Sequence, residues 1–261
     1  MSVPQVWVGT GWKMNKTIAE AVAYTRELAA ATIPDGVQAF ILPPHTALAA
    51  VRQELPANSP VLIGAQNAHW GAEGAQTGEI SMRMAADAGA VMVEIGHSER
   101  RADHGETDET VCLKARAALD AGLIPLVCVG ESAAMRDEGS AEASVLAQVN
   151  RAFDDVREKE VARVIVAYEP VWAIGEHGRA ATVEETAPVM AAIAAELASR
   201  SNGAGGVTLL YGGSVNCDNA AQLLADPNTD GLFVGRAAWT AAGLLALIDI
   251  ARDHISRPLA P

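Results

Sequence analysis

Three residues whose side chains can move or hold a charge come shortly after apolar runs of the sequence. They are Glu169, His97 and Lys13, and each lies where β-branched residues give way to a polar or glycine-containing loop. A carboxylate can accept a proton, an imidazole can donate a proton or a hydrogen bond, and an ammonium group can bind an anion. Together these groups fit proton transfer on an anionic small molecule, provided that the fold brings them to one place.

Glu169 ends the run Val164–Tyr168 and is followed by Pro170 and Trp172. Such a run predicts a buried parallel strand with the carboxylate at its C-terminal end. The apolar and aromatic neighbours should partly desolvate the carboxylate and make it a better proton acceptor near neutral pH. The alternative is a surface carboxylate that ends a strand, which is the more usual environment of glutamate.

His97 lies where a strand is expected to give way to a polar helical turn that begins at Ser98. The positive end of a helix dipole favours the neutral imidazole, which can still donate a hydrogen bond to a substrate oxygen. Lys13 follows the first apolar run and can direct its ammonium group into the mouth of a barrel. Considered singly, a structural histidine and a solvated lysine are the commoner roles of such residues.

Eight short β-branched runs recur at about one per thirty residues, the length of one strand-helix unit. They are Val6–Val8, Ala39–Leu42, Val61–Gly64, Val91–Ile95, Ile124–Val129, Val164–Tyr168, Val207–Tyr211 and Gly231–Val234. Between them, a capping box at Thr182 predicts a helix to Arg200, and Gly122 ends a helix that starts near Thr107. Eight units favour an α/β fold, a single (β/α)8 barrel formed by residues 1–261 as one domain. A doubly wound sheet is the alternative, but its Gly-x-Gly-x-x-Gly sequence does not follow the first run.

Glycine-containing turns after the seventh and eighth runs suit an anion. The two turns are Tyr211-Gly212-Gly213-Ser214 and Val234-Gly235-Arg236. Glycines let backbone N–H groups approach an anion closely, and the loops after the last two strands of a barrel are its usual phosphate site. A third segment, Gly175-Glu176-His177-Gly178-Arg179, has the composition of a lid, with Glu176 and His177 expected to be solvated.

Composition narrows the class of protein further. The net charge is −13 with only 19 lysines and arginines, which argues against binding to nucleic acid. An anionic substrate would have to be attracted by a local positive field inside a cleft. No signal peptide or membrane-length apolar span is found in the sequence. Three widely spaced cysteines predict free thiols and a cytoplasmic protein, with Cys128 in a packing role, and no cysteine-histidine spacing indicates a metal site.

The segment 66–79 is long for a connection between a strand and a helix, and it carries Trp70. A large aromatic side chain in such a loop would be left in water by a monomer. We therefore expect an intersubunit loop, with a local lid that folds Trp70 onto its own barrel as the alternative.

Six motifs, in this order along the chain, resemble the triosephosphate isomerase family. They are Trp12-Lys13-Met14-Asn15, Gly64-Ala65-Gln66-Asn67, Thr77-Gly78-Glu79, Gly96-His97-Ser98-Glu99-Arg100-Arg101, the segment 167–175 and Tyr211-Gly212-Gly213-Ser214-Val215. The resemblance implies proton transfer between adjacent carbons of a phosphorylated ketose or aldose, through a cis-enediolate and without a cofactor or metal. It implies Glu169 as the base, His97 as the neutral electrophile and Lys13 as the cation that holds the substrate and intermediate.

The same resemblance implies supporting roles for Glu99, Ser98 and Tyr211. It places the phosphate on backbone N–H groups of Gly175, Ser214, Gly235 and Arg236, under a lid from Pro170 to about Arg179 that bonds to the turn after Tyr211. It also implies a homodimer formed through the loop 66–79, with Thr77 reaching into the site of the partner subunit.

The chain departs from the family pattern at three places. Gly11 replaces an asparagine that contacts the substrate beside Lys13, the lid tip is one residue longer, and Gly235-Arg236, followed by Trp239, replaces Gly-Gly. Removing the side chain at position 11 could admit one more CHOH group, a change worth about 1 to 3 kcal/mol of discrimination.

The segments 8–16 and 231–239 are similar to the branch of the family that isomerises four-carbon ketose phosphates in erythritol catabolism. The preferred hypothesis is therefore conversion of L-erythrulose 1-phosphate to D-erythrulose 4-phosphate. The alternatives are glycolytic triosephosphate isomerase, which interconverts dihydroxyacetone phosphate and glyceraldehyde 3-phosphate, and a sugar-phosphate-binding barrel without turnover. An aldolase would need a Schiff-base lysine deep in the barrel, and Lys13 is the only lysine found at the end of a predicted strand.

Overall fold

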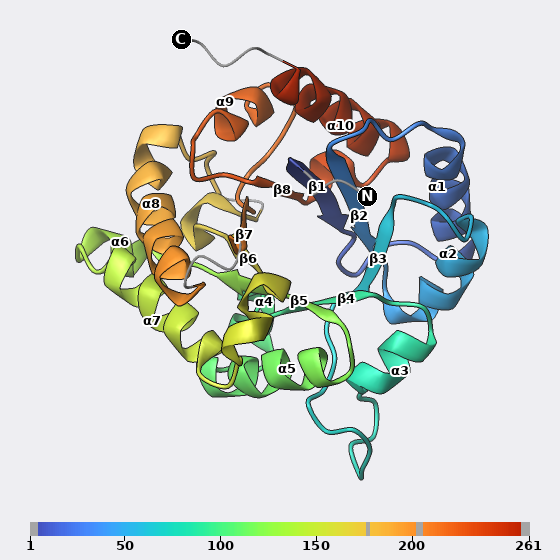
Figure 1. Cartoon of the computed structure of the whole chain (residues 1–261), viewed down its shortest axis with the longest axis horizontal. Helices are drawn as coiled ribbons and strands as arrows, with labels where there is room; N and C mark the ends of the chain where they lie inside the picture. The colour runs from blue at the N-terminus through green and yellow to red at the C-terminus, as the bar shows by residue number, and fades with distance from the viewer. Residues whose placement is uncertain (1–4, 176–177, 202–205, 257–261) are drawn as a thin grey trace.

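The computed structural model describes residues 5–175, 178–201 and 206–256 of the chain (Figure 1). Within these residues, eight parallel strands pair in sequence order, and β8 pairs with β1 to close the barrel. The (β/α)8 barrel predicted from the sequence is confirmed. The strands are β1 Val6–Gly11, β2 Val37–Leu42, β3 Leu62–Ala65, β4 Met92–Ile95, β5 Ile124–Val129, β6 Ile165–Tyr168, β7 Thr208–Tyr211 and β8 Gly231–Val234.

The α-helices surround the ring of strands (Figure 1). They are α1 Ile18–Ala30, α2 Leu48–Glu54, α3 Met82–Asp87, α4 Ser98–Asp103, α5 Asp108–Asp120, α6 Ala133–Asp137, α7 Ala141–Phe153, α8 Val183–Arg200, α9 Ala220–Leu224 and α10 Ala241–Ile255. Short 3-10 helices are η1 His45–Ala47, η2 Glu158–Arg163, η3 Val171–Ala173 and η4 Arg236–Ala238. No helix in the described ranges is both long enough and apolar enough to cross a membrane.

The helix ends follow the chemistry of the sequence. Thr182 accepts a hydrogen bond from the backbone of Glu185, and the Glu185 carboxylate accepts one from the Thr182 backbone, so the predicted capping box opens α8. Gly122 has φ +82° just after α5, a backbone conformation that favours glycine. The first strand is longer than the apolar run Val6–Val8 indicates, because pairing with β2 continues to Gly11.

Two layers of apolar side chains fill the molecule. One layer lies between strands and helices, and the other lies inside the barrel, where Phe40, Met92, Leu126, Cys128 and Phe233 pack together. Cys128 is buried in this inner layer, which confirms its packing role, and all three cysteines are free thiols. The barrel is therefore a packed core whose open space lies at its rim.

The segment between β3 and α3 extends away from the barrel at the bottom of Figure 1. Residues 72–79 are exposed, including Thr77. Trp70 stacks on His69 with ring centroids 4.0 Å apart and remains 39 % exposed. Trp70 is thus partly covered by its own chain and partly open to solvent.

Candidate active site

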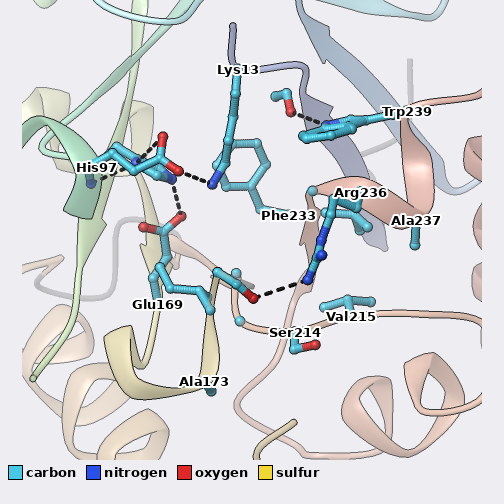
Figure 2. A pocket seen from close by; sticks show the side chains of 18 of the residues that line it. Lys13, His97, Glu169, Ala173, Ser214, Val215, Phe233, Arg236, Ala237 and Trp239 are labelled. Carbon is cyan, nitrogen blue, oxygen red and sulfur yellow. Dashed lines mark hydrogen bonds and ion pairs between the residues drawn. The ribbon is translucent and has the colours of Figure 1, made fainter. Parts of the chain in front are cut away.

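A cavity of about 280 Å³ opens among the C-terminal ends of the strands (Figure 2). Glu169, His97 and Lys13 all line it, although they come from the ends of β6, β4 and β1. Its volume is close to the lower limit of about 300 Å³ that is typical of small-molecule sites. The three residues that the sequence singled out are therefore brought together.

Glu169 and His97 face each other, with 3.7 Å between Glu169 Oε1 and His97 Nε2 (Figure 2). The Glu169 residue is only 3 % exposed, and its backbone N–H donates to the Val129 carbonyl at 2.7 Å. Gly212 makes room for this carboxylate, since a Cβ at position 212 would lie 2.9 Å from Glu169 Cγ. The second carboxylate oxygen, Oε2, is buried without a hydrogen-bond partner among the described residues. A carboxylate held in this way is directed at whatever occupies the cavity.

His97 is the N-cap of α4, as its position in the sequence predicts. The backbone N–H of Glu99 donates to His97 Nδ1 at 3.1 Å, so the neutral ring carries its proton on Nε2, toward Glu169. Burial lowers the pKa of the imidazole, but the carboxylates of Glu169 and Glu94 outweigh it and hold the pKa above its ordinary value. The hydrogen bond from the Glu99 backbone thus favours the neutral imidazole, whereas the facing carboxylates favour the protonated one.

Lys13 adopts φ +54°, a left-handed conformation that costs a non-glycine residue about 1 to 3 kcal/mol. Its ammonium group lies 2.6 Å from Glu99 Oε1 and points into the cavity (Figure 2). Partial burial raises the pKa of the Glu99 carboxyl, but the hydrogen bond and charge of Lys13 outweigh it, so the pKa lies below its ordinary value. The ionised Glu99 holds the Lys13 ammonium group over the cavity.

The residues expected to bind phosphate line the opposite part of the same cavity. These residues are Gly175, Ser214, Gly235 and Arg236. The Arg236 guanidinium group reaches across and donates to the Gly175 carbonyl at 3.1 Å (Figure 2). Lys13 and Arg236 are the lysine and arginine side chains that line the cavity within the described ranges. Glu176 and His177, at the expected lid tip, lie outside the described residues.

The start of the expected lid is fixed to the body of the protein through Glu131. This carboxylate is fully buried and accepts hydrogen bonds from Trp172 Nε1 at 2.6 Å and from the Tyr168 hydroxyl at 3.1 Å. Farther along, the Arg136 and Arg179 guanidinium groups lie over the Trp172 ring. The sequence did not identify Glu131, whose partners are 37 and 41 residues away.

Ser98 and Tyr211, the remaining sequence-predicted residues, do not line the cavity. Their hydroxyl groups are buried and have no hydrogen-bond partner in the part of the chain that the structure describes. Gly213 accommodates the Tyr211 hydroxyl, because a Cβ there would lie 2.3 Å from its oxygen. Neither hydroxyl group therefore lines the cavity.

The floor of the cavity holds a carboxyl group that sequence reasoning missed. Glu94, from the middle of β4, lines the cavity beside Gly11 and Phe233. A Cβ added to Gly11 would lie 3.5 Å from Glu94 Oε2 and 3.3 Å from Phe233 Cζ. The signal was available: Glu94 is the one acidic residue in the otherwise apolar run Val91–Ile95, at a position predicted to be buried.

Glu94 and Cys128 lie next to the Glu169 carboxylate. One carboxylate oxygen of each glutamate and the Cys128 sulfur lie within 4.8 Å of one another. Burial raises the pKa of the Glu94 carboxyl to about 7 and raises that of the Cys128 thiol well above its ordinary value. Metal ligands must be deprotonated, so these environments oppose the ligating forms of both groups. The arrangement fits hydrogen bonding better than metal binding.

The structure is a parallel (β/α)8 barrel with a buried carboxylate, an imidazole and an ammonium group around one cavity at its rim. These features define a class of barrel proteins that carry out acid-base chemistry on small molecules. The sequence profile of triosephosphate isomerase matches residues 6–251, and the chain belongs to this family.

Relatives and solved structures agree with this membership. An L-erythrulose-1-phosphate isomerase of Mycolicibacterium smegmatis is 51 % identical over 257 residues, covering 97 % of this chain and 96 % of the relative. A protein of the same name from Rhizobium meliloti is 47 % identical over 251 residues, covering 95 % and 97 %. The crystal structure of triosephosphate isomerase from Bartonella henselae superposes with a TM-score of 0.86 at 34 % identity, covering 95 % of this chain and 99 % of that one.

Proposed function

We propose that this protein is a sugar-phosphate isomerase that converts L-erythrulose 1-phosphate to D-erythrulose 4-phosphate through a cis-enediolate, without a cofactor. The observation that carries the reaction type is the pairing of Glu169 Oε1 and His97 Nε2, 3.7 Å apart, in a cavity that also holds Lys13. An acid-base pair and a cation around one small cavity supply what an enediolate reaction needs.

In this mechanism Glu169 removes the proton from C3 of L-erythrulose 1-phosphate and returns it to C2. The C2 carbonyl oxygen gains a proton and the C3 hydroxyl loses one, and His97 Nε2 mediates this exchange between the two oxygens. Lys13 stabilises the negative charge that develops on the enediolate, and the Glu99 carboxylate, 2.6 Å from its ammonium group, positions it. The atoms balance, because one carbon-bound and one oxygen-bound proton each change place.

The phosphate end of the substrate would bind to the backbone of Gly175, Ser214 and Gly235, with the Arg236 guanidinium group beside them. A net charge of −13 repels an anion at long range, so local cations matter more in this chain than in a neutral one. Space at Gly235 supports the assignment, since a Cβ there would meet no other atom within 4 Å. The lid 170–179 would close over the phosphate and exclude water.

Two observations support a four-carbon substrate. The relatives from Mycolicibacterium smegmatis and Rhizobium meliloti carry the name L-erythrulose-1-phosphate isomerase at 51 % and 47 % identity. In addition, Gly11 lines the cavity beside Lys13 without a side chain, so no side chain at this position takes up cavity space. The extra hydroxymethyl group of the tetrulose is the part that such space would accept.

The test is a side-by-side measurement of kcat/KM for L-erythrulose 1-phosphate and dihydroxyacetone phosphate with purified protein. We expect the four-carbon substrate to be preferred by at least about tenfold. Glu169→Asp is the control for contaminating isomerases, because it should lower both activities, and prior dialysis against a chelator should change neither. A three-carbon preference would assign the protein to triose phosphate, and binding without turnover would make it a non-catalytic barrel.

We further propose a homodimer formed through the loop 66–79, located in the cytoplasm. The projecting loop, its exposed Trp70 and the three free thiols support these assignments.

A further inference from the structure

Glu94 carries a buried carboxyl group that has few hydrogen-bond partners in the protein. The residue is 5 % exposed and lies on the floor of the cavity. Among the described residues, its one side-chain hydrogen bond comes from the Cys128 thiol, a weak donor, at 3.8 Å to Oε1. Burying a carboxyl group without strong partners is costly, so such a group calls for a reason beyond packing.

The position of Glu94 in the cavity indicates which end of the substrate it would contact, namely the end opposite the phosphate. Its Oε2 lies 3.5 Å from the position that a Gly11 Cβ would take, and Phe233 lies on the other side of the same position. The phosphate-binding residues come from the lid and the loops after β7 and β8, whereas Glu94 is in β4. A substrate that spans from those loops to Glu169 and His97 directs its far end toward the part of the cavity that Gly11, Glu94 and Phe233 line.

The charges around Glu94 indicate which chemical groups can bind in this part of the cavity. The Glu169 carboxylate lies close to it, so an anionic group is repelled from the floor. Burial raises the pKa of Glu94 to about 7, with the charge of His97 acting against the rise and that of Glu169 adding to it. A carboxyl group of this kind can donate to a hydroxyl oxygen when protonated or accept from a hydroxyl group when ionised. A neutral alcohol is the ligand that fits both forms.

We propose that Glu94 is a specificity-determining residue that hydrogen-bonds the terminal C4 hydroxyl group of a four-carbon substrate from the floor of the cavity. The inference rests on the proposed function and deepens it, because it names the side chain that selects the tetrulose. Gly11 provides the space for the hydroxymethyl group, and Glu94 provides its polar partner. A three-carbon substrate has no group at this position and leaves Glu94 without a ligand.

The experiment compares three substrates on the purified enzyme and its variants. The substrates are L-erythrulose 1-phosphate, its 4-deoxy analogue, which keeps the extra carbon but lacks its hydroxyl group, and dihydroxyacetone phosphate. The variants are Glu94→Met, which removes the hydrogen bond at similar length, and Glu94→Gln, which keeps donor and acceptor atoms. Met92→Leu is the matched control, because Met92 is buried two residues earlier in β4 and does not line the cavity.

We expect the wild-type enzyme to prefer the tetrulose phosphate over its 4-deoxy analogue by about 10- to 100-fold in kcat/KM. Glu94→Met should abolish this discrimination, because kcat/KM falls further for the natural substrate, mainly through a higher KM, than for its 4-deoxy analogue or for dihydroxyacetone phosphate. Glu94→Gln and Met92→Leu should keep most of the discrimination. Retained triose phosphate turnover also shows that Glu94→Met is folded.

Two results would overturn the inference while the proposed function stands. One is a wild-type enzyme that isomerises L-erythrulose 1-phosphate and its 4-deoxy analogue equally well. The other is an equal loss of all three activities in Glu94→Met with recovery of none in Glu94→Gln, which would mean that Glu94 acts on the neighbouring Glu169. A wild-type enzyme that turns over none of these substrates would instead refute the proposed function.

Discussion

Gly11 lines the cavity beside Lys13 and Glu94 and contributes no side chain to it. Its carbonyl oxygen accepts a hydrogen bond from Trp239 Nε1 at 3.1 Å, so the backbone at this point is held in place (Figure 2). A Cβ there would lie 3.3 Å from Phe233 Cζ and 3.5 Å from Glu94 Oε2, so an asparagine side chain would be crowded against two residues that line the cavity.

We therefore expect Gly11→Asn to lower kcat/KM for L-erythrulose 1-phosphate by about 10- to 100-fold, the discrimination given by a filled subsite. Activity on dihydroxyacetone phosphate should stay the same or rise, because the smaller substrate does not use that space. Steady-state kinetics with both substrates measure the ratio. If the ratio stayed at its wild-type value, the space at position 11 would not be where the fourth carbon binds.

The raised pKa of Glu94 has a consequence for stability. The unfolded chain ionises this residue near its ordinary pKa of 4.5, whereas the folded protein ionises it near pH 7. Between these values the folded state holds more protons, so the contribution of Glu94 to stability falls as the pH rises from about 4.5 to 7. The charges of His97, Glu169, Lys13 and Glu99 act on the Glu94 carboxyl group. Cys128, in β5, donates a hydrogen bond to it.

Glu94→Gln should therefore be more stable than the wild-type protein at pH 8, by an amount on the order of 3 kcal/mol. The advantage should shrink toward zero at pH 4.5, where the native carboxyl group is protonated and uncharged. Urea unfolding of both proteins at several pH values measures the difference in free energy. A difference that does not depend on pH would show that Glu94 ionises normally in the folded protein.

At the scale of elements, a buried ion pair joins α5 to the end of β4 and to the loop after β3. The Lys114 ammonium group in α5 donates to Glu106 Oε2 at 2.9 Å and to Asn67 Oδ1 at 2.7 Å. The other oxygen of Glu106 accepts from the Gly96 backbone, next to His97, at 2.8 Å. Burial raises the pKa of Glu106, but the hydrogen bond and charge of Lys114 outweigh it, and the pKa lies below its ordinary value.

Lys114→Met should lower the free energy of unfolding by about 1 to 3 kcal/mol, because the buried Glu106 carboxylate and Asn67 Oδ1 lose a donor while Arg100 Nε, 2.9 Å from Glu106 Oε2, remains. Its effect should be larger at pH 7 than at pH 4, where Glu106 takes up a proton more readily once Lys114 no longer lowers its pKa. Arg252→Met is the control: Arg252 pairs with Asp249 and Asp253 on the surface of α10, where solvent screens the interaction, so its loss should cost much less than the loss of Lys114. Chemical unfolding of the two variants gives the comparison, and equal costs would contradict the assignment.

The same elements show what could be predicted from the sequence. Glu169, His97 and Lys13 were identified because each lies at the end of a strand, where local pattern is enough to place a side chain at the barrel rim. Glu94 was missed because it is inside a strand, and an apolar run alone does not tell which residues face the inside of the barrel. The Lys114 contact with Asn67 spans 47 residues, and such pairs depend on the closed barrel rather than on local sequence.

At the scale of the whole molecule, the loop 66–79 is the feature that a single barrel does not explain. Near its start, Asn67 accepts a hydrogen bond from Lys114, and the loop then extends outward with residues 72–79 exposed (Figure 1). An anchored base and a projecting tip are what a loop needs in order to enter a second copy of the chain. The barrels themselves repel each other, since each carries a net charge of −13.

We expect a particle of about twice the 27.1 kDa chain mass in sedimentation experiments, with a dimer affinity that increases with salt as the repulsion is screened. Thr77→Arg should place an extra charge in the interface, dissociate the dimer and lower kcat/KM, because Thr77 of the partner subunit is expected to complete the site. Glu142→Arg, on the exposed face of α7, makes a larger change in net charge away from the loop and should leave the dimer intact. If Thr77→Arg remained a dimer, the subunits would associate through another surface, and the exposure of Trp70 would need a different explanation.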